Sequence, residues 1–212
     1  PVLEFVIDDT EEFAQNIYQT LDNLENLKKP ENYRMIGTEI LQAVGNSKNI
    51  ILVCHRHPDP DTLGSAGALA FYLQKLNKKV VIFCSTEISG NMDFLNLRNF
   101  YDFAPDFNSA EMIICLDCAD EKQTGLSTEI LAEQREKIFN IDHHTSNNRF
   151  GFVNLLLPTS STCEIIYKIF LANNIEIEKN QATALLTGLL TDTGFFGNAA
   201  TTAESFAIGS EL

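Results

Sequence analysis

The chain has 212 residues, and its 15 Lys or Arg against 29 Asp or Glu give a formal net charge of −14 at pH 7. This length suffices for a domain with a substantial core, and an apolar content of 44% is typical of a globular protein rather than a disordered or fibrous one. So acidic a chain is a poor candidate for non-specific nucleic-acid binding, which requires a basic surface. An anionic substrate would need local positive charge, and a metal ion is the obvious supply.

The hydropathy and cysteine patterns favour a cytoplasmic protein that contacts no membrane. No apolar run approaches the roughly 18 residues of a membrane helix, and the first residues lack the basic and apolar segments of a signal peptide. The cysteine count is odd, at five, and four cysteines lie in or beside apolar runs, which predicts reduced core thiols. Cys115 and Cys118 form a C-x-x-C sequence, but without a second pair a metal or redox role is the less favoured interpretation.

Residues 1–45 are expected to form an N-terminal helical extension. Between residues 11 and 28, apolar side chains recur at spacings of four, four and three, which predicts a helix with one apolar face. We interpret this face as packed on the core, with a dimer contact as the alternative. Pro30 interrupts the chain, and a second helix is predicted from Asn32 to Val44, ending near Gly45.

Residues 46–212 are predicted to form an α/β domain, because strands and helices alternate along them. The predicted strands are continuous apolar runs, as expected for strands covered on both faces: Asn49–Cys54, Lys79–Cys84, Met112–Leu116 and Lys137–Ile141. The predicted helices are Leu63–Leu76, Ser127–Gln134, Ser161–Asn173 and Lys179–Thr191, with a short helix and loop at Asp93–Phe103. This alternation predicts a mostly parallel sheet with helices on both faces and right-handed crossovers.

The last residues have the pattern of a further helix. Thr201 and Glu204 have the spacing of a capping box, yet only a few residues follow before Leu212. We therefore expect this sequence to be part of a longer chain, with a short terminal helix as the alternative.

All four histidines fall in two short segments that also carry aspartates. In the first segment these residues are His55, His57, Asp59 and Asp61, and in the second Asp142, His143 and His144. Each segment begins where a predicted strand ends, and Asp117 likewise follows the third predicted strand. Because sites in open α/β sheets lie beyond the carboxyl ends of the strands, we expect these side chains to meet at one edge of the sheet.

Imidazoles and carboxylates together are typical ligands of first-row divalent metals, and a carboxylate-rich set favours Mn or Mg over Zn. A later acid, Asp192, lies at a polar break after an apolar helix, where Gly194 lets the backbone turn. The candidate ligands are then too many for a single ion that also keeps open coordination positions. They are His55, Asp59, Asp61, Asp117, His143 and Asp192. Two ions about 3.5–4 Å apart that share one carboxylate account for this set, and Asp117, on the middle strand, is the natural bridge.

Each of these residues also has a purely structural interpretation. Asp61 could cap the helix that follows it, Asp117 could be a turn residue at a strand end, and Asp192 could be a loop acid. A residue such as His57 more often faces solvent or supports a ligand than binds a metal. Because these interpretations together require several coincidences at one sheet edge, we favour the metal site.

The same segments resemble, in order, the four motifs of the DHH phosphoesterases. The matching motifs are His55-x-x-x-Asp59-x-Asp61 with Leu63-Gly-Ser65, the isolated Asp117, Asp142-His-His144, and Asp192-Thr-Gly194. From about Asn49 onward the chain is most similar to the group of nano-RNases and 3′-phosphoadenosine-5′-phosphate (pAp) phosphatases, and Pro158–Glu164 resembles the Ser-Ser/Thr stretch of that group. RecJ-type exonucleases and Mn-dependent inorganic pyrophosphatases are more distant relatives.

The resemblance implies a phosphoesterase that hydrolyses short oligonucleotides, dinucleotides or pAp with two divalent ions, expected to be Mn²⁺. His144 would face the scissile phosphate, and Asp142 would orient the site. The resemblance also implies that the chain has no sequence-specific DNA binding, and it leaves a homodimer open. One ion would be held by His55, Asp59 and Asp117, and the other by Asp61, Asp117, His143 and Asp192.

The chain departs from the family pattern at His57, where Asn is usual, and at Pro60, where Gly is frequent. His57, Ser65 and Arg149 are the candidate substrate-binding residues, Ser65 because its backbone is expected to open the helix after the first motif. The resemblance also implies a C-terminal DHHA1 domain that grips the substrate, and we expect that domain to be absent from this chain. The competing interpretations are a metal-dependent nucleotide-binding module without useful turnover and an inorganic pyrophosphatase.

Overall fold

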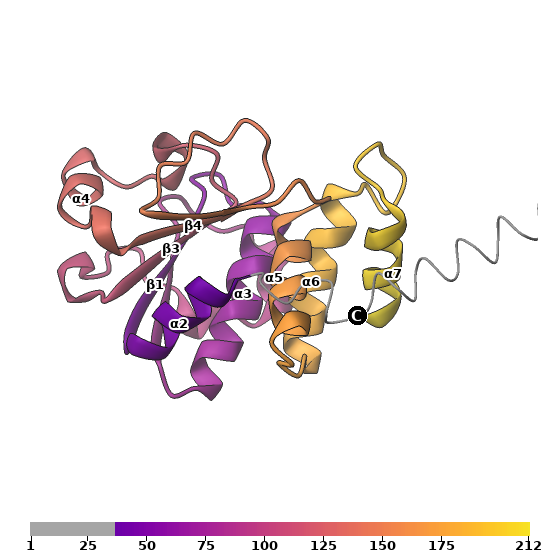
Figure 1. The fold of residues 1–212 in the computed structure, drawn as a ribbon, viewed down its shortest axis with the longest axis horizontal. Helices are drawn as coiled ribbons and strands as arrows, with labels where there is room; N and C mark the ends of the chain where they lie inside the picture. The colour runs from indigo at the N-terminus through magenta and orange to yellow at the C-terminus, as the bar shows by residue number, and fades with distance from the viewer. Residues whose placement is uncertain (1–36) are drawn as a thin grey trace, which may run out of the picture.

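The computed structural model describes residues 37–212, which form a five-stranded parallel sheet with helices on both faces (Figure 1). The strands are β1 (Asn49–Cys54), β2 (Lys79–Phe83), β3 (Met112–Leu116), β4 (Ile138–Asp142) and β5 (Val153–Leu156). Their order is β2-β1-β3-β4-β5, and every neighbouring pair is parallel. The predicted α/β class is therefore confirmed, while the helix predicted for residues 11–28 lies outside the described residues.

The helices correspond to the predicted ones with shifted ends. They are α2 (Thr38–Asn46), α3 (Pro60–Lys75), α4 (Thr128–Glu133), α5 (Thr162–Ala172), α6 (Lys179–Asp192) and α7 (Ala203–Glu211), and short 3₁₀ turns at Gly90–Leu95 and Arg98–Phe100 replace the short helix predicted there. The capping box of α7 pairs Thr202 with Ser205, one residue later than the predicted pair Thr201 and Glu204. Strand β5 was not predicted, because its four residues are half-buried at the sheet edge and form no long apolar run.

The start of α3 differs most from the sequence-based expectation. The helix begins at Pro60 instead of Leu63, since the Asp59 carboxylate accepts hydrogen bonds from the backbone N–H groups of Asp61 and Thr62. Proline is favoured in the first helical turn, where its missing N–H costs nothing. The N-cap is therefore Asp59, and the alternative role considered for Asp61 as the cap is wrong.

The core lies on both faces of the sheet, and side chains alternate between the faces along each strand. Ile50, Leu52 and Cys54 of β1 belong to the cluster that packs against α2, α3, α5 and α6. Ile51 and Val53 point to the opposite face, where the cluster includes side chains from the region of α4. The continuous apolar sequence of β1 thus follows from burial on both faces.

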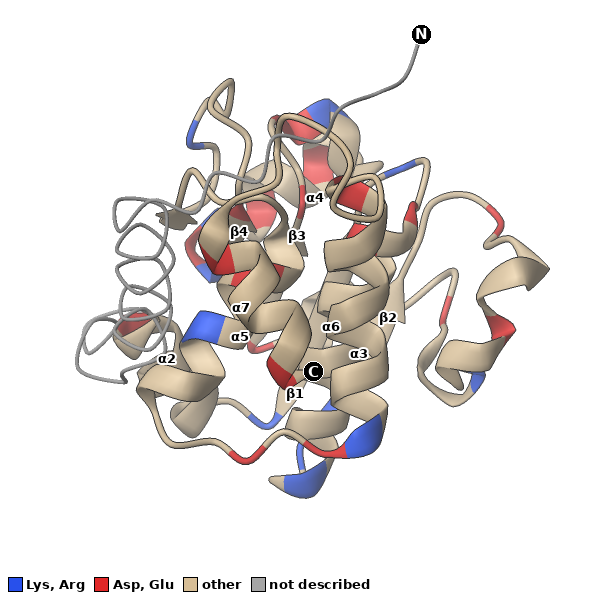
Figure 2. Cartoon of the chain, turned by 90° about the vertical axis from the view of Figure 1, so that its right-hand side faces the viewer, with Lys and Arg blue, Asp and Glu red and all other residues tan. Residues whose placement is uncertain are grey.

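Helices α3 and α6 approach each other closely at glycine residues. A Cβ atom at Gly64 would lie 3.3 Å from the carbonyl carbon of Ala184, and one at Gly188 would lie 2.7 Å from Asp61 Oδ1. This contact brings the end of α6 beside the start of α3. Helix α7 then packs beside α5 and α6 (Figure 2).

The environment of the cysteines agrees with the prediction, since all five are free and buried in the core. Within residues 37–212, no helix combines the length and the apolar character that crossing a bilayer requires.

Candidate metal centre

The register of the sheet places three of the predicted site residues next to one another. Cys54 of β1 pairs with Leu116 of β3, and Leu116 pairs with Ile141 of β4. The residues that follow these positions, His55, Asp117 and Asp142, are therefore neighbours at the carboxyl edge. The chain order reverses between β1 and β3, which is where parallel α/β sheets open a crevice for ligands.

The first group of potential ligands consists of His55, Asp59 and Asp117, whose ligand atoms all lie within 4.8 Å of one another. His55 Nε2 lies 3.3 Å from Asp59 Oδ2 and 3.5 Å from Asp117 Oδ2. Burial alone would raise the pKa of Asp59, but hydrogen bonds from His55 and from the backbone of α3 outweigh it and lower that pKa. Asp59 thus uses one oxygen to cap α3 and turns the other toward His55.

The second group consists of Asp61, His143 and Asp192, again with all ligand atoms within 4.8 Å of one another. His143 Nε2 lies 3.4 Å from Oδ2 of Asp192, the last residue of α6. Asp61 is fully buried, and its two oxygens accept the backbone N–H groups of Thr162 and Cys163 at distances of 2.7 and 2.9 Å. The first turn of α5 therefore fixes the Asp61 carboxylate.

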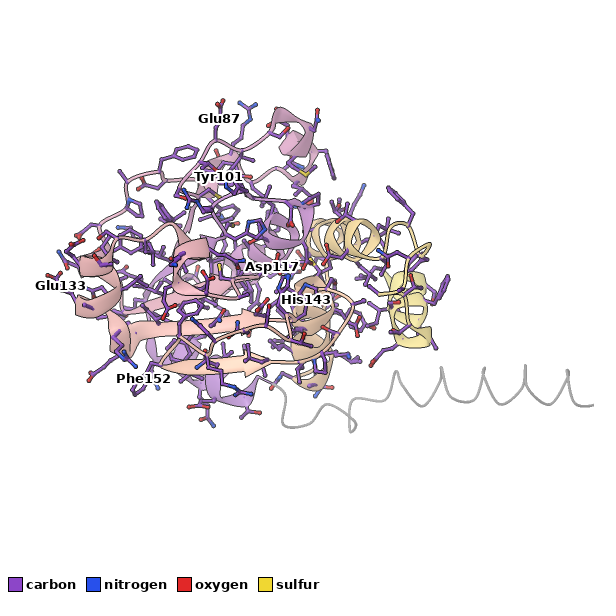
Figure 3. The ribbon with its side chains drawn as sticks, turned by 90° about the horizontal axis from the view of Figure 1, so that it is seen from above. Glu87, Tyr101, Asp117, Glu133, His143 and Phe152 are labelled. Carbon is purple, nitrogen blue, oxygen red and sulfur yellow. The ribbon has the colours of Figure 1, made fainter. Side chains whose placement is uncertain are left out.

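Asp117 belongs to the first group and also faces His143 of the second. Its Oδ2 is 3.5 Å from His55 Nε2, and its Oδ1 is 3.5 Å from His143 Nε2, as the adjacent positions of Asp117 and His143 in Figure 3 illustrate. The Thr162 hydroxyl donates to Oδ1 at 3.0 Å. The backbone of Asp117 has a φ of +60°, a left-handed conformation that costs a non-glycine residue about 1–2 kcal/mol and that functional sites often retain.

The charge balance of this cluster favours a cation. Burial, and then the nearby carboxylates of Asp61 and Asp59, raise the pKa of Asp117 well above its usual range. Burial and the same neighbours raise the pKa of Asp192 to about 8. Within residues 37–212, the ion pairs of these acids are all with histidine. Carboxylate oxygens and imidazole nitrogens crowded in this way fit divalent metal ions, which would replace proton binding as the means of relieving the repulsion.

His144 and Asp142 form a hydrogen-bonded pair beside the cluster. Asp142 Oδ1 accepts from His144 Nδ1 at 2.7 Å, and Asp142 Oδ2 accepts from the Asn147 amide at 2.7 Å. The hydrogen bond that His144 donates to Asp142 raises the pKa of His144, which favours the protonated imidazole near neutral pH. The His144 side chain is 43% exposed and lines a pocket of about 280 Å³. The other lining residues are His143, Thr145, Asn147, Arg149, Leu156, Leu157 and Pro158.

The three predicted substrate-binding residues have different environments. Arg149 lines the pocket beside His144. His57 is exposed in the loop between β1 and α3 and is not among the residues that line this pocket. Ser65 is fully buried in the second turn of α3, where its hydroxyl donates to the Thr62 carbonyl. The expectation that Ser65 opens the helix is wrong, because α3 already begins at Pro60.

Sequence reasoning did not identify three residues that form hydrogen bonds to the candidate site residues. Thr162 donates to Asp117, Asn147 donates to Asp142, and the carbonyl oxygen of Thr159 accepts from His143 Nδ1 at 3.2 Å. The signal for two of them was the polar segment Pro158–Glu164, which runs into the first turn of the apolar helix α5. This segment resembles a family motif, but the resemblance assigned no role to the individual residues of the segment.

Comparisons with known proteins agree with this architecture. The model of the DHH family, N-terminal domain, matches residues 49–189. The bifunctional oligoribonuclease and PAP phosphatase NrnA of Thermus thermophilus is 30% identical over 185 residues, which cover 86% of this chain and 54% of the relative. A probable manganese-dependent inorganic pyrophosphatase of Streptococcus thermophilus is 27% identical over 171 residues, which cover 77% of this chain and 54% of the relative.

The solved structures give the same result at the level of the fold. An exopolyphosphatase-related protein from Bacteroides fragilis is similar with a TM-score of 0.73 at 25% identity, covering 82% of this chain and 54% of that one. The chain therefore spans about half the length of the relatives that it matches. Because the family match extends over more than half of the sequence, the chain belongs to the DHH family, and residues 49–189 correspond to its N-terminal domain.

Proposed function

We propose that the chain is the metal-binding part of a phosphoesterase that uses two divalent ions, expected to be Mn²⁺, to hydrolyse short nucleotide substrates. The observation that carries this proposal is the position of Asp117. Its two carboxylate oxygens face different histidines, His55 and His143, each at 3.5 Å. A carboxylate placed in this way between two groups of ligands has the arrangement of a bridging ligand in a two-metal site.

The proposed ligand sets follow from the two groups: one ion would be held by His55, Asp59 and Asp117, and the other by Asp61, Asp117, His143 and Asp192. When bound, the ions would supply an activated water and offset charge on the phosphoryl oxygens. The protein's own contribution is to hold the ligands and to provide an acid. Asp142 accepts from His144 Nδ1 and favours the imidazolium form, whose Nε2–H would donate its proton to the leaving oxygen and leave His144 neutral.

The pocket beside His144 supports a nucleotide substrate. Its lining includes His144 and Arg149, which suit a phosphate group, and the apolar residues Leu156–Pro158, which suit a base or a sugar. A nucleotide offers both kinds of surface, whereas pyrophosphate offers only the charged one. We therefore propose short oligonucleotides, dinucleotides or pAp as substrates, in agreement with the names of the NrnA relatives.

Inorganic pyrophosphate is the second candidate substrate. The similarity to the probable manganese-dependent pyrophosphatase supports it, and the proposed ligand set would serve either reaction. The apolar residues that line the pocket would then have no function in catalysis. For this reason we place pyrophosphate after nucleotides.

Product analysis distinguishes these possibilities. Purified protein with Mn²⁺ is offered a dinucleotide, pAp and pyrophosphate in parallel, and we expect mononucleotide or phosphate from the first two only. Asp117→Asn should abolish turnover and metal binding, while Asp106→Asn, an exposed cap at the opposite end of β3, should leave both unchanged. Release of phosphate from pyrophosphate alone would favour the second candidate. Nucleotide binding without any product would contradict the enzymatic proposal.

A further inference from the structure

Two charged residues of α5 are buried next to the segment that contacts the candidate ligands. Glu164 and Lys168 lie one helical turn apart, with side-chain exposures of 2% and 7%. Lys168 Nζ lies 2.8 Å from Glu164 Oε1 and 2.8 Å from Oε2 of Glu204, on α7. Burying charges is costly even when they are paired, and a well-packed apolar pair could fill the same space without that cost. The arrangement therefore calls for an explanation beyond packing.

The other oxygen of Glu164 holds one particular peptide group. Glu164 Oε2 accepts from the backbone N–H of Ser160 at 3.1 Å and also from the Ser160 hydroxyl. That N–H belongs to the peptide unit between Thr159 and Ser160. The carbonyl of the same unit points the other way, because a trans peptide is planar with its C=O and N–H on opposite sides, and it accepts from His143 Nδ1 at 3.2 Å.

This peptide determines which nitrogen of His143 carries the proton. A carbonyl oxygen can only accept a hydrogen bond, so Nδ1 must be protonated. Nε2 is then free as a ligand and faces Asp117 Oδ1 at 3.5 Å and Asp192 Oδ2 at 3.4 Å. A carboxylate bound to the N–H end of the amide also polarises its carbonyl, which strengthens the hydrogen bond from His143. Such outer partners orient metal-ligating histidines and increase their basicity.

We propose that Glu164 is a positioning residue for His143, acting through the Thr159–Ser160 peptide, and that Lys168 fixes Glu164 in place. The inference rests on the proposed metal ligation by His143. It makes a selective prediction, because His143 is a ligand of only one of the two ions in the proposed ligand sets. Loss of Glu164 should weaken the ion held by Asp61, His143 and Asp192 and spare the ion held by His55 and Asp59.

The test replaces the buried ion pair in two ways. Glu164→Leu with Lys168→Met removes both charges together with the acceptor for the Ser160 N–H. Glu164→Gln with Lys168→Met removes the charges and keeps an acceptor oxygen. Lys75→Met with Glu178→Gln is the matched control, since it removes a 2.7 Å ion pair between α3 and the start of α6, about 20 Å along that helix from Asp192.

Calorimetric titration of the metal-free proteins with Mn²⁺ gives the number of sites and their affinities. We expect two sites in the wild type and the control. In the Leu variant one site should be weaker by about 10–100-fold and the other should stay within about twofold, with the Gln variant between the Leu variant and the wild type. Two unchanged sites, equal weakening of both sites, or a Gln variant as weak as the Leu variant would each overturn the proposal.

A second measurement needs neither metal nor substrate. Imidazole ¹⁵N chemical shifts of the metal-free wild type should report the Nδ1–H form of His143, and the Leu variant should show a mixture of both tautomers. If circular dichroism shows that the Leu variant is unfolded, the Gln variant alone is compared with the wild type, and a smaller loss confined to the same site is expected. A wild type that binds two ions and hydrolyses nothing would refute the proposed function while leaving this inference standing.

Discussion

Substitution of Gly188 by alanine sets two effects of similar size against each other. In an exposed helix interior, Gly→Ala stabilises a protein by about 0.5–1 kcal/mol, because glycine loses more backbone entropy on folding. At position 188, however, the new Cβ would lie 2.7 Å from Asp61 Oδ1 and 2.8 Å from Asp61 Cα. The favourable separation for such contacts is about 3.5–4.0 Å, so the neighbouring atoms must move by about 1 Å.

Overpacking of this kind typically costs about 1–3 kcal/mol and therefore outweighs the gain in helix propensity. A net loss of about 1–2 kcal/mol corresponds to a decrease in Tm of about 2–8 °C for a protein of this size. Calorimetric unfolding of the metal-free protein measures this change. Because Asp61 has to move, the Mn²⁺ affinity of its site should decrease as well.

Gly45→Ala provides the matched control. Gly45 also lies in a helix, α2, and a Cβ atom there would meet nothing within 4 Å. The control should keep or raise the Tm. If both variants raise the Tm by similar amounts, the close contact between α6 and Asp61 is not what positions the acid, and the reasoning is refuted.

Three further predictions concern charge and hydrogen bonding at the site. The pKa of Asp192 is about 8 in the folded metal-free protein and near 4 when unfolded, so the contribution of its bound proton to stability is complete below pH 4 and is lost as the pH rises toward 8. The Tm of the metal-free protein should therefore fall between pH 5 and 8, and a Tm that rises over this interval would contradict the assignment. His144→Ala should keep the Mn²⁺ stoichiometry while turnover drops by about 10²–10⁴-fold, and loss of metal would instead make His144 a ligand. Thr162→Val removes the 3.0 Å hydrogen bond to Asp117 at nearly constant volume, which should weaken Mn²⁺ binding by about tenfold in calorimetry; unchanged affinity would show that this hydrogen bond does not position Asp117.

The sheet could be predicted where its strands are covered on both faces. Met112–Leu116 is a short apolar run with turn residues after it, and the structure gives β3 the same limits. β5 differs because a half-buried strand at the sheet edge needs no continuous apolar sequence. At α3, Asp59 and Pro60 are residues typical of a helix start, but the apolar periodicity begins only at Leu63. The prediction followed the periodicity and therefore placed the start of the helix too late.

The candidate site could be predicted as a set of residues but not as a network. Histidines and aspartates after successive strands must meet at one edge, because parallel strands end there together. The groups that orient them come from elsewhere. Thr162 reaches Asp117 across 45 positions and Asp61 across 101, and contacts at such separations leave no periodic signal in the sequence. Burial of Ser65 likewise depends on the tertiary packing of α3, which the spacing of the first motif does not reveal.

The ends of three helices give the two acids of the second group opposite electrostatic surroundings. Asp61 lies in the first turn of α3 and meets the first turn of α5, where the partial positive charge of helix N-termini offsets part of the cost of its burial. Asp192 terminates α6, where the partial negative charge of a helix C-terminus opposes a carboxylate. The helix ends thus stabilise the charge of Asp61 without a cation, whereas the charge of Asp192 has to be balanced by a group other than the backbone. Binding or loss of a cation should therefore change how well the last turn of α6 is ordered before it changes the rest of the fold.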